Sequence, residues 1–158
     1  LHLVEPDAPC DARIITPAQQ QGGEVLQPIW RDRYLLALPP AWPLSLQSQL
    51  TLDDFQDLPL IKRTPCDAWD QLQTALNRQN IKADIRANIH TIEYAIGLVG
   101  AGIGCALVPA FESHRNRAEM QTRPLELPLA ERQLVLAFDK NQQHQNAVKL
   151  LCEIAARG

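Results

Sequence analysis

Short aliphatic runs alternate with apolar residues at helical spacing along most of this chain, and this alternation limits the fold more than any other feature. Residues 58–61 and 103–108 are mostly apolar runs of the length that buried strands have. Between them, Trp69, Leu72 and Leu76 recur at the spacing of a helix with one buried face. Strands that alternate with helices in this way predict an α/β fold.

Several helix boundaries can be predicted from single residues. Asp67 and Thr91 are expected to cap the two helices that begin next to them, because short polar side chains accept hydrogen bonds from first-turn N–H groups. Gly100 and Gly102 are expected to end the second of these helices, since glycine adopts the left-handed conformation without steric cost. Thr51 is expected to cap a single helical turn.

The two ends of the chain differ in how clearly they can be interpreted. Residues 133–138 form an aliphatic run that predicts a last strand. A C-terminal helix should follow, with four apolar residues at helical spacing on its buried face: Ala147, Leu150, Leu151 and Ile154. Within residues 1–30, which are rich in Pro, Gln and Gly, Ile14 and Ile15 form the only strand-like pair.

The charge balance argues against nucleic-acid binding by this segment itself. The 158 residues carry a formal net charge of -3, whereas binding to a phosphate backbone needs clustered Lys and Arg. The basic residues stand in small groups, such as Arg31 with Arg33 and Arg115 with Arg117, which are typical of solvated surface. The length suits one compact unit or two small lobes.

The cysteines give no sign of a metal site or a disulfide framework. Cys10, Cys66, Cys105 and Cys152 are far apart and form no CxxC pair. We expect four reduced, structural thiols, although a bridge between distant positions stays open.

Two further features concern the membrane and the compartment. No apolar stretch approaches the ~20 residues that cross a bilayer, and the first residues do not form a secretory leader. We therefore expect a cytoplasmic protein with no membrane partner.

No catalytic motif stands out, so we expect a protein that is not an enzyme and that uses no cofactor and no metal. The glycines of residues 100–104 follow a helix and precede a strand, the reverse of the dinucleotide-binding order. His2, His114 and His144 have no carboxylate or cysteine at ligand spacing, and neither has His90. His90 differs from the others because it lies where a strand meets a helix N-terminus.

Two strand-to-helix junctions are the candidates for ligand binding. They lie at residues 63–66 and 90–92. Helix N-termini present unpaired N–H groups and partial positive charge, which favour carboxylates and other anions. At the carboxyl ends of strands in an open α/β sheet, such junctions form a ligand crevice. The alternative is that Thr64 and Thr91 only satisfy local backbone donors.

The order of these segments resembles the effector-binding domain of LysR-type transcriptional regulators. The most specific tract is Ile96-Gly97-Leu98-Val99-Gly100-Ala101-Gly102-Ile103-Gly104-Cys105-Ala106-Leu107-Val108-Pro109, which is similar to the family's Leu-Val-Ala-Ala-Gly-Leu-Gly-Ile-Ala-Leu-Val-Pro hallmark. Residues 34–44 resemble a strand that ends in proline before a His-Pro-Leu turn, with Trp42 in place of the histidine. Residues 51–61 resemble its Leu-x-Asp-Leu and Pro-Leu-Ile stretches, and residues 10–14 its Leu-Asp-Leu-Ala-Ile segment, with Arg13 as a departure.

The resemblance implies a type 2 periplasmic-binding-protein-like fold with two α/β lobes joined by two crossover strands. We expect residues 1–39 to form an incomplete first lobe with the first crossover strand, and residues 40–131 the second lobe. Residues 132–158 would form the second crossover strand and a helix that returns to the first lobe. The family's amino-terminal helix-turn-helix domain and the start of the first lobe are expected to be absent from this chain.

The resemblance also implies an effector-sensing function, in which a small anionic metabolite binds in the cleft between the lobes. Eight residues match the family's cleft positions and are the predicted ligand-binding residues: Thr16, Arg63, Thr64, Pro65, Cys66, His90, Thr91 and Ile92. The implied partners are a small-molecule effector, further copies in a homodimer or homotetramer, and DNA only through the helix-turn-helix domain. Two alternatives stay open, an extracytoplasmic solute-binding protein of the same fold and an enzyme on the same scaffold.

Overall fold

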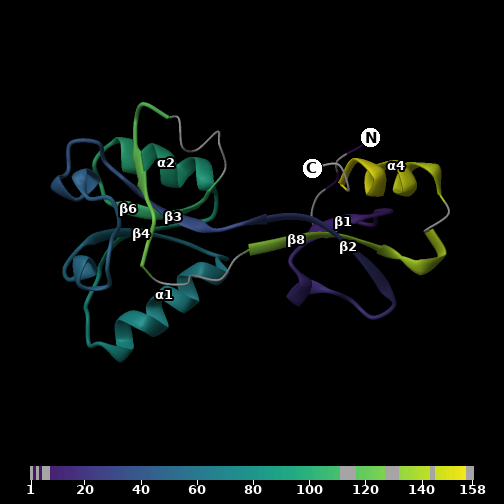
Figure 1. Cartoon of the computed structure of the whole chain (residues 1–158), viewed down its shortest axis with the longest axis horizontal. Coiled ribbons are helices and arrows are strands. Elements are labelled where there is room, and N and C mark those ends of the chain that lie inside the picture. Colours follow the sequence, from purple (N-terminus) through teal and green to yellow (C-terminus); the bar gives the residue numbers. More distant parts are fainter. Residues whose placement is uncertain are drawn as a thin grey trace. The chain divides into compact units, whose positions relative to one another are not determined.

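The structure is a computed structural model that describes residues 2, 4, 8–110, 117–126, 132–142 and 145–155 (Figure 1). The chain divides into two compact units, one of Leu1–Arg31 with Arg132–Gly158 and one of Asp32–Glu131. Each unit has its own sheet. Strand β3 (Tyr34–Leu38), which was expected to be part of the first crossover strand, belongs to the sheet of the second unit. The predicted lobe boundaries and crossover strands stay predictions.

The second unit contains a mixed sheet of five strands in the order β5-β4-β6-β3-β7. Strands β4 (Pro59–Arg63), β5 (Asp84–Ile89) and β6 (Cys105–Pro109) run parallel, with β4 in the middle. Strand β3 runs antiparallel to β6 and to β7 (Gln121–Arg123). Helices α1 (Asp67–Arg78) and α2 (Ile92–Gly100) connect the parallel strands. The predicted α/β order is confirmed here.

Successive residues of β3 enter two different cores, one on each face of this sheet. Leu36 and Leu38 belong to the cluster that contains the α1 residues, whereas Leu35 and Ala37 belong to the cluster with the α2 residues. Because side chains alternate across a strand, a strand that is apolar at every position must be covered on both faces. Figure 1 shows α1 and α2 on opposite sides of the sheet.

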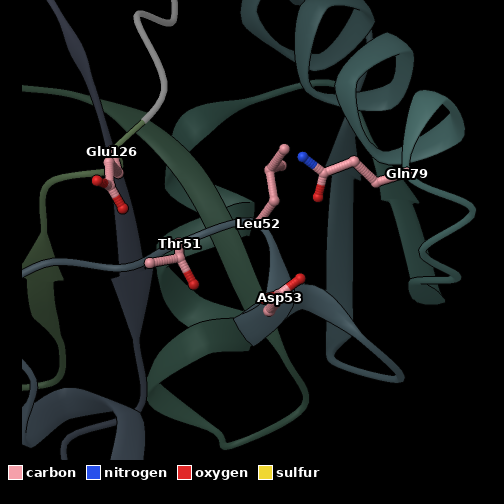
Figure 2. A pocket seen from close by; sticks show the side chains of 5 residues that line it. All are labelled: Thr51, Leu52, Asp53, Gln79 and Glu126. Atoms are coloured by element: carbon pink, nitrogen blue, oxygen red, sulfur yellow. The ribbon is translucent and has the colours of Figure 1, made fainter.

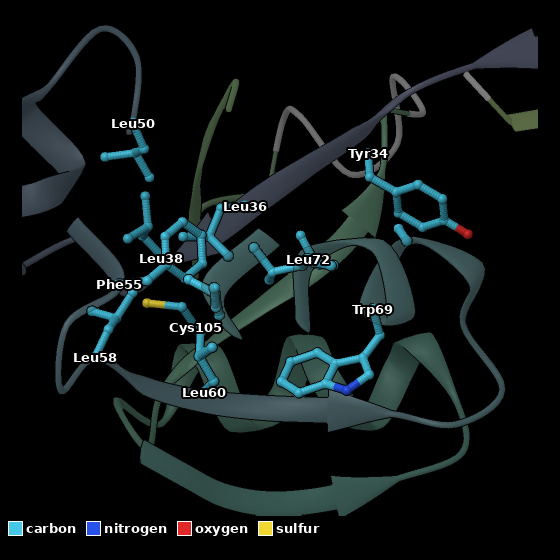
Figure 3. Close-up of a cluster of buried hydrophobic side chains, with 13 residues drawn as sticks. Tyr34, Leu36, Leu38, Leu50, Phe55, Leu58, Leu60, Trp69, Leu72 and Cys105 are labelled. Carbon is cyan, nitrogen blue, oxygen red and sulfur yellow. The ribbon is translucent and has the colours of Figure 1, made fainter. Parts of the chain in front are cut away.

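The larger cluster is centred on one face of α1 (Figure 3). Leu72 and Leu76 are fully buried and Trp69 is almost so, which confirms the predicted helical stripe. Phe55 reaches this cluster from η3 (Asp53–Phe55), a short 3₁₀ helix that follows another, η2 (Pro43–Leu46). Burial of a side chain such as Leu72 stabilises the fold by roughly 1.5 to 3 kcal/mol.

Two of the predicted helix caps are wrong. Asp67 is the first residue of α1, and Cys66 occupies the cap position without a side-chain cap bond. The predicted turn after Thr51 exists, but Leu52 is its N-cap. Thr51 instead donates from its backbone N–H and its hydroxyl to the Asp54 carboxylate, at 2.8 and 3.0 Å. Asp67 thus lies one position past the cap, and Thr51 is bonded to Asp54 instead of capping the turn.

The boundaries of α2 agree with the sequence prediction. The Thr91 hydroxyl accepts a hydrogen bond from the Tyr94 backbone N–H at 3.3 Å. Gly100 is the last helical residue. Gly102 follows with a φ of 75°, a left-handed conformation that favours glycine.

The first unit has a sheet of three strands in the order β1-β8-β2. Strand β1 (Arg13–Ile15) is antiparallel to β8 (Arg132–Asp139), and both were expected from their aliphatic residues. Strand β2 (Glu24–Asp32) was not expected. It contains Pro28, which has no backbone N–H to donate. This is possible because β2 lies at the edge of the sheet, where not every N–H has to donate to a neighbouring strand. Short 3₁₀ helices, η1 (Pro17–Gln19) and η4 (Lys140–Gln142), follow β1 and β8.

The C-terminal helix α4 (Asn146–Ala155) was predicted, but the predicted buried face is wrong in part. Val148 is fully buried against Leu136 and Phe138. Leu151 is half-buried beside them as expected, whereas Leu150 and Ile154 are 57% and 58% exposed, and Ala147 is exposed too. The helix is therefore rotated relative to the prediction. No described helix is both long and apolar enough to span a membrane.

Candidate functional site

The two predicted junctions lie next to each other at the carboxyl ends of β4 and β5. The strands are parallel neighbours, and Arg63 is in register with Ile89. One residue later, the Thr64 N–H donates to the Ile89 carbonyl oxygen at 2.9 Å. Because both strands end here, α1 and α2 begin close to each other, as expected for adjacent strand-to-helix connections.

Thr64 links the two junctions through both its side chain and its backbone. Its hydroxyl donates to the Asn88 side-chain oxygen Oδ1 at 3.2 Å. Its carbonyl oxygen accepts from His90 Nδ1 at 2.9 Å. A carbonyl can only accept, so the proton of the neutral His90 ring lies on Nδ1. Thr64 and His90, two predicted site residues, are thus in direct contact.

Asn88 is a member of this site that the sequence analysis missed. It lies one residue before the end of β5 and is exposed. The available signal was a polar residue in a predicted strand, just ahead of the helix cap at Thr91. Such a residue was not distinguishable by type or spacing from ordinary exposed strand residues.

Arg63 is half-buried and is already used by its own loop. Its Nη1 donates to the Pro65 carbonyl oxygen at 2.8 Å. Its Nε is buried without a hydrogen-bond acceptor among the described residues. A buried donor without a partner costs roughly 1 to 3 kcal/mol. Because Nη1 has two N–H groups and the bond to Pro65 uses one of them, the guanidinium keeps further donors at Nη1 and Nη2.

The remaining predicted residues of these junctions have structural contacts. Cys66 is half-buried against the α1 cluster, and its carbonyl oxygen accepts from the Trp69 N–H at 3.0 Å. Ile92 packs against the α2 cluster. Pro65 is exposed and follows a cis peptide bond. Pro65 is therefore the most exposed of these three.

Thr16 lies in the first unit, directly after β1. It is the N-cap of η1, and its N–H and hydroxyl donate to Gln19 Oε1 at 3.0 and 3.2 Å. These bonds give the Thr16 side chain a structural role at the start of η1. Its ligand-binding role stays a prediction.

The charges near the two helix starts come from a few residues. Glu93, in the first turn of α2, pairs with Arg117 at 3.3 Å. Arg117 also lies 3.9 Å from Glu119. Lys62 Nζ lies 5.6 Å from the centre of the Trp69 ring, a cation–π contact on the α1 side of the sheet.

No metal site is formed by the part of the chain that the structure describes. The four cysteines all lie in that part and are free thiols, as expected. His114, His144 and Arg115 lie outside the described residues.

Two surface hollows of the second unit are lined by described residues outside the two junctions. One, of about 410 Å³, is shown in Figure 2 and is lined by Thr51, Leu52, Asp53, Gln79 and Glu126. The other, of about 370 Å³, lies along α1 and is lined by Asp70, Gln71, Thr74, Ala75 and Arg78. Gln79 follows the last residue of α1, and the helix has 12 residues, so the first hollow is roughly 18 Å from the start of α1. No predicted ligand-binding residue lines either hollow.

Comparison with known proteins identifies the class to which this fold and these junctions belong. Residues 7–158 match the family model of the LysR substrate binding domain, so the chain belongs to this family. The expected type 2 periplasmic-binding-protein-like fold is confirmed. Regulators of this family bind small-molecule effectors and DNA and are generally oligomeric. The chain is therefore a substrate-binding domain of this family, whose members are parts of transcription regulators and not enzymes.

One curated relative and two solved structures illustrate the match. The HTH-type transcriptional regulator AlsR of Bacillus subtilis (strain 168) is 28% identical over 149 residues, which cover 92% of this chain and 49% of AlsR. The chain thus spans about half the length of this relative. The effector binding domain of QuiR in complex with shikimate has a TM-score of 0.75 and 19% identity, covering 93% of this chain and 70% of that one. The regulatory domain of CcmR from Synechocystis PCC6803 in complex with 2-PG has a TM-score of 0.76 and 14% identity, covering 93% and 72%.

Proposed function

We propose that this chain senses a small anionic metabolite for a LysR-type transcriptional regulator, with a ligand site at the starts of α1 and α2. The observation that carries the proposal is the meeting of the two helix N-termini beside Thr64. Two helix N-termini that open at one place concentrate partial positive charge and free N–H groups, which is a favourable environment for an anion.

The start of α2 has donors left for a ligand. The Tyr94 N–H is bonded to the Thr91 hydroxyl, and the Ala95 N–H to the Thr91 carbonyl oxygen. The N–H groups of Ile92 and Glu93 precede these, and no helical carbonyl is available to them. The Thr91 hydroxyl accepts in its cap bond, so its own proton can be donated to an anion.

Arg63 supplies a full positive charge beside the loop that leads into α1. It closes β4, one residue before Thr64. Its Nη2 can donate to a carboxylate or phosphate oxygen while Nη1 holds the Pro65 carbonyl oxygen. Together, Arg63, Thr91 and the helix N–H groups make an anion the best-matched ligand. The other predicted residues of the two junctions surround these donors: Thr64, Pro65, Cys66, His90 and Ile92.

The proposal also covers the DNA binding, the oligomeric state and the compartment of the whole regulator. The regulator binds DNA through a helix-turn-helix domain, as the name HTH-type transcriptional regulator indicates for AlsR. It acts as a homodimer or homotetramer, and it acts in the cytoplasm because its DNA is there.

Calorimetric titration of the 158-residue chain with shikimate and, separately, with 2-PG tests the site. These two molecules are chosen because related domains were solved in complex with them. We expect the chain to bind at least one of them. Arg63→Gln should then weaken that binding about tenfold to a hundredfold, since a hydrogen bond to a charged group contributes about 1.5 to 3 kcal/mol.

Arg78→Gln is the matched control. Arg78 lies at the last turn of α1 and lines the second hollow, so the same charge is removed far from the candidate site. It should leave the affinity unchanged. Loss of binding in Arg78→Gln but not in Arg63→Gln would move the ligand to that hollow and contradict the proposal.

A further inference from the structure

The hydrogen bond between Thr64 and Asn88 has a definite direction. The two atoms that it joins, Thr64 Oγ1 and Asn88 Oδ1, are both oxygens and lie 3.2 Å apart. A bond between two oxygens needs a proton, and only the threonine hydroxyl carries one. The hydroxyl proton is therefore used within the protein, and Thr64 can offer a ligand only lone pairs.

The same bond leaves the Asn88 amide nitrogen with its two N–H groups. An asparagine amide has one accepting oxygen and one NH₂ group with two donors. Oδ1 faces Thr64, and within the described part of the chain the side-chain nitrogen Nδ2 has no acceptor. Asn88 is exposed, so these donors are accessible to a ligand.

The position of Asn88 in the sheet brings these donors to the start of α1. Asn88 is in register with Lys62 on the neighbouring parallel strand, and residues in register lie on the same face of a sheet. The ammonium of Lys62 lies over the ring of Trp69, the third residue of α1. Asn88 therefore lies on the α1 face, close to the first turn of that helix and to the charge of Lys62.

Thr64 itself is held in place from three directions. Its N–H is bonded to the Ile89 carbonyl, its carbonyl to His90 and its hydroxyl to Asn88. The bond to the anchored Thr64 holds the Asn88 side chain in place, with Oδ1 facing the hydroxyl and Nδ2 left on the other side of the amide. Fixed donors bind an anion better than mobile ones, because less side-chain entropy is lost on binding.

We propose that Asn88 is a specificity-determining residue of the effector site: its Nδ2 donates to an oxygen of the bound anion, and Thr64 orients the amide. The inference rests on the proposed function, because it places the ligand at the starts of α1 and α2. It assigns donation to a residue that lies on a strand rather than at a helix terminus, and it makes Thr64 a positioning residue.

Calorimetric titration with shikimate and with 2-PG, each alone, tests this assignment in four variants. Asn88→Leu removes both donors without a change of charge, and we expect it to weaken binding of the accepted probe about tenfold or more. Thr64→Val removes the orienting hydroxyl and should weaken binding by about threefold, less than Asn88→Leu. Asn88→Asp keeps an acceptor for Thr64 but replaces the donors with an anionic oxygen, so it should weaken binding at least as much as Asn88→Leu.

Asn77→Leu is the matched control. Asn77 is exposed near the far end of α1, where its Oδ1 accepts from Gln73 at 3.1 Å. It should bind like the wild type, and the melting temperature of each variant shows that it is folded.

Two results would overturn the role of Asn88. A larger loss in Thr64→Val than in Asn88→Leu would make the hydroxyl the donor, and wild-type affinity in Asn88→Asp would reduce Asn88 to a tether for Thr64. If Arg63→Gln still weakens binding in these cases, the proposed function stands without this inference. A wild-type chain that binds neither probe would overturn both.

Discussion

His90 Nδ1 lies 2.9 Å from the carbonyl oxygen of Thr64, and this bond ties the loop before α2 to the loop before α1. The two residues are 26 positions apart in the sequence. The parallel pairing of β4 and β5 brings them together. Because the two loops are bonded to each other, a ligand that contacts one loop also affects the position of the other.

His90→Asn and His90→Gln should separate the role of this bond from that of the ring. The asparagine amide N–H can occupy the place of Nδ1, whereas the glutamine amide extends toward the place of Nε2. We expect His90→Gln to speed hydrogen exchange at the Thr64 amide about fivefold, because a net hydrogen bond contributes about 1 kcal/mol. His90→Asn should exchange like the wild type. Equal exchange rates in all three proteins would show that the bond does not hold the loop.

Gly104 and Gly97 should respond in opposite directions to substitution by alanine. A Cβ at Gly104 would lie 2.8 Å from the Pro59 carbonyl oxygen. We expect Gly104→Ala to destabilise the fold by about 1 to 3 kcal/mol, since β4 must move. Gly97 lies within α2 with nothing within 4 Å of such a Cβ, so Gly97→Ala should stabilise by roughly 0.5 to 1 kcal/mol. Urea denaturation measures both, and shifts of the same sign would refute the close approach at Gly104.

The stability of the first unit should depend on the ionisation of Glu24. The backbone N–H of Gln21, 2.7 Å from the carboxylate, is the main cause that lowers the pKa of Glu24, and Arg13 contributes through a two-oxygen contact at 2.7 and 2.8 Å. Since the folded pKa lies below the ordinary value of 4.5, the stabilisation is complete above that value and is lost as the pH falls through the folded pKa.

Comparison of Glu24→Gln with the wild type by denaturation across the acid range checks this dependence. The difference in unfolding free energy should be constant near neutral pH and should shrink below about pH 4.5. A difference that does not change on acidification would show that the carboxylate contacts do not stabilise the folded state.

Cys105 should resist alkylation in the folded protein. It is fully buried in β6, and burial raises the pKa of its thiol to about 12. Alkylation requires the thiolate, which is then scarce at pH 8. Mass spectrometry after iodoacetamide treatment should find Cys105 modified only in urea, with exposed Cys10 as the internal control that reacts in the folded state. Equal labelling of the two cysteines without urea would contradict the burial of Cys105.

The sequence predicted those elements in which local pattern and tertiary packing agree. Strand β3 is apolar throughout because both of its faces are covered, and Leu72 and Leu76 lie on one face of α1 because that face meets the sheet. Such patterns are visible in the sequence because burial selects them. Thr91 could be predicted for a similar reason, since its cap bond is made within four residues.

Apart from the two helix caps, the misses depend on contacts between segments that are distant in the sequence. Strand β2 contains Pro28 and is accepted at a sheet edge, which the residues alone do not reveal. The rotation of α4 depends on the position of Val148 against Leu136. Asn88 could not be assigned because its partner, Thr64, is 24 residues away. The helix starts of the candidate site could thus be predicted from the sequence. The hydrogen bonds of Thr64 to Asn88 and His90 could be found only from the structure.

Mapping of ligand contacts by nuclear magnetic resonance tests the central claim most directly. In the ¹⁵N-labelled chain titrated with shikimate and with 2-PG, we predict that the largest shifts occur at the backbone amides of Thr64, Ile92 and Glu93 and at the Asn88 side-chain amide. Shifts confined to Asp53, Gln79 and the other residues of the hollow in Figure 2 would contradict the account, and so would the absence of any shift with both probes.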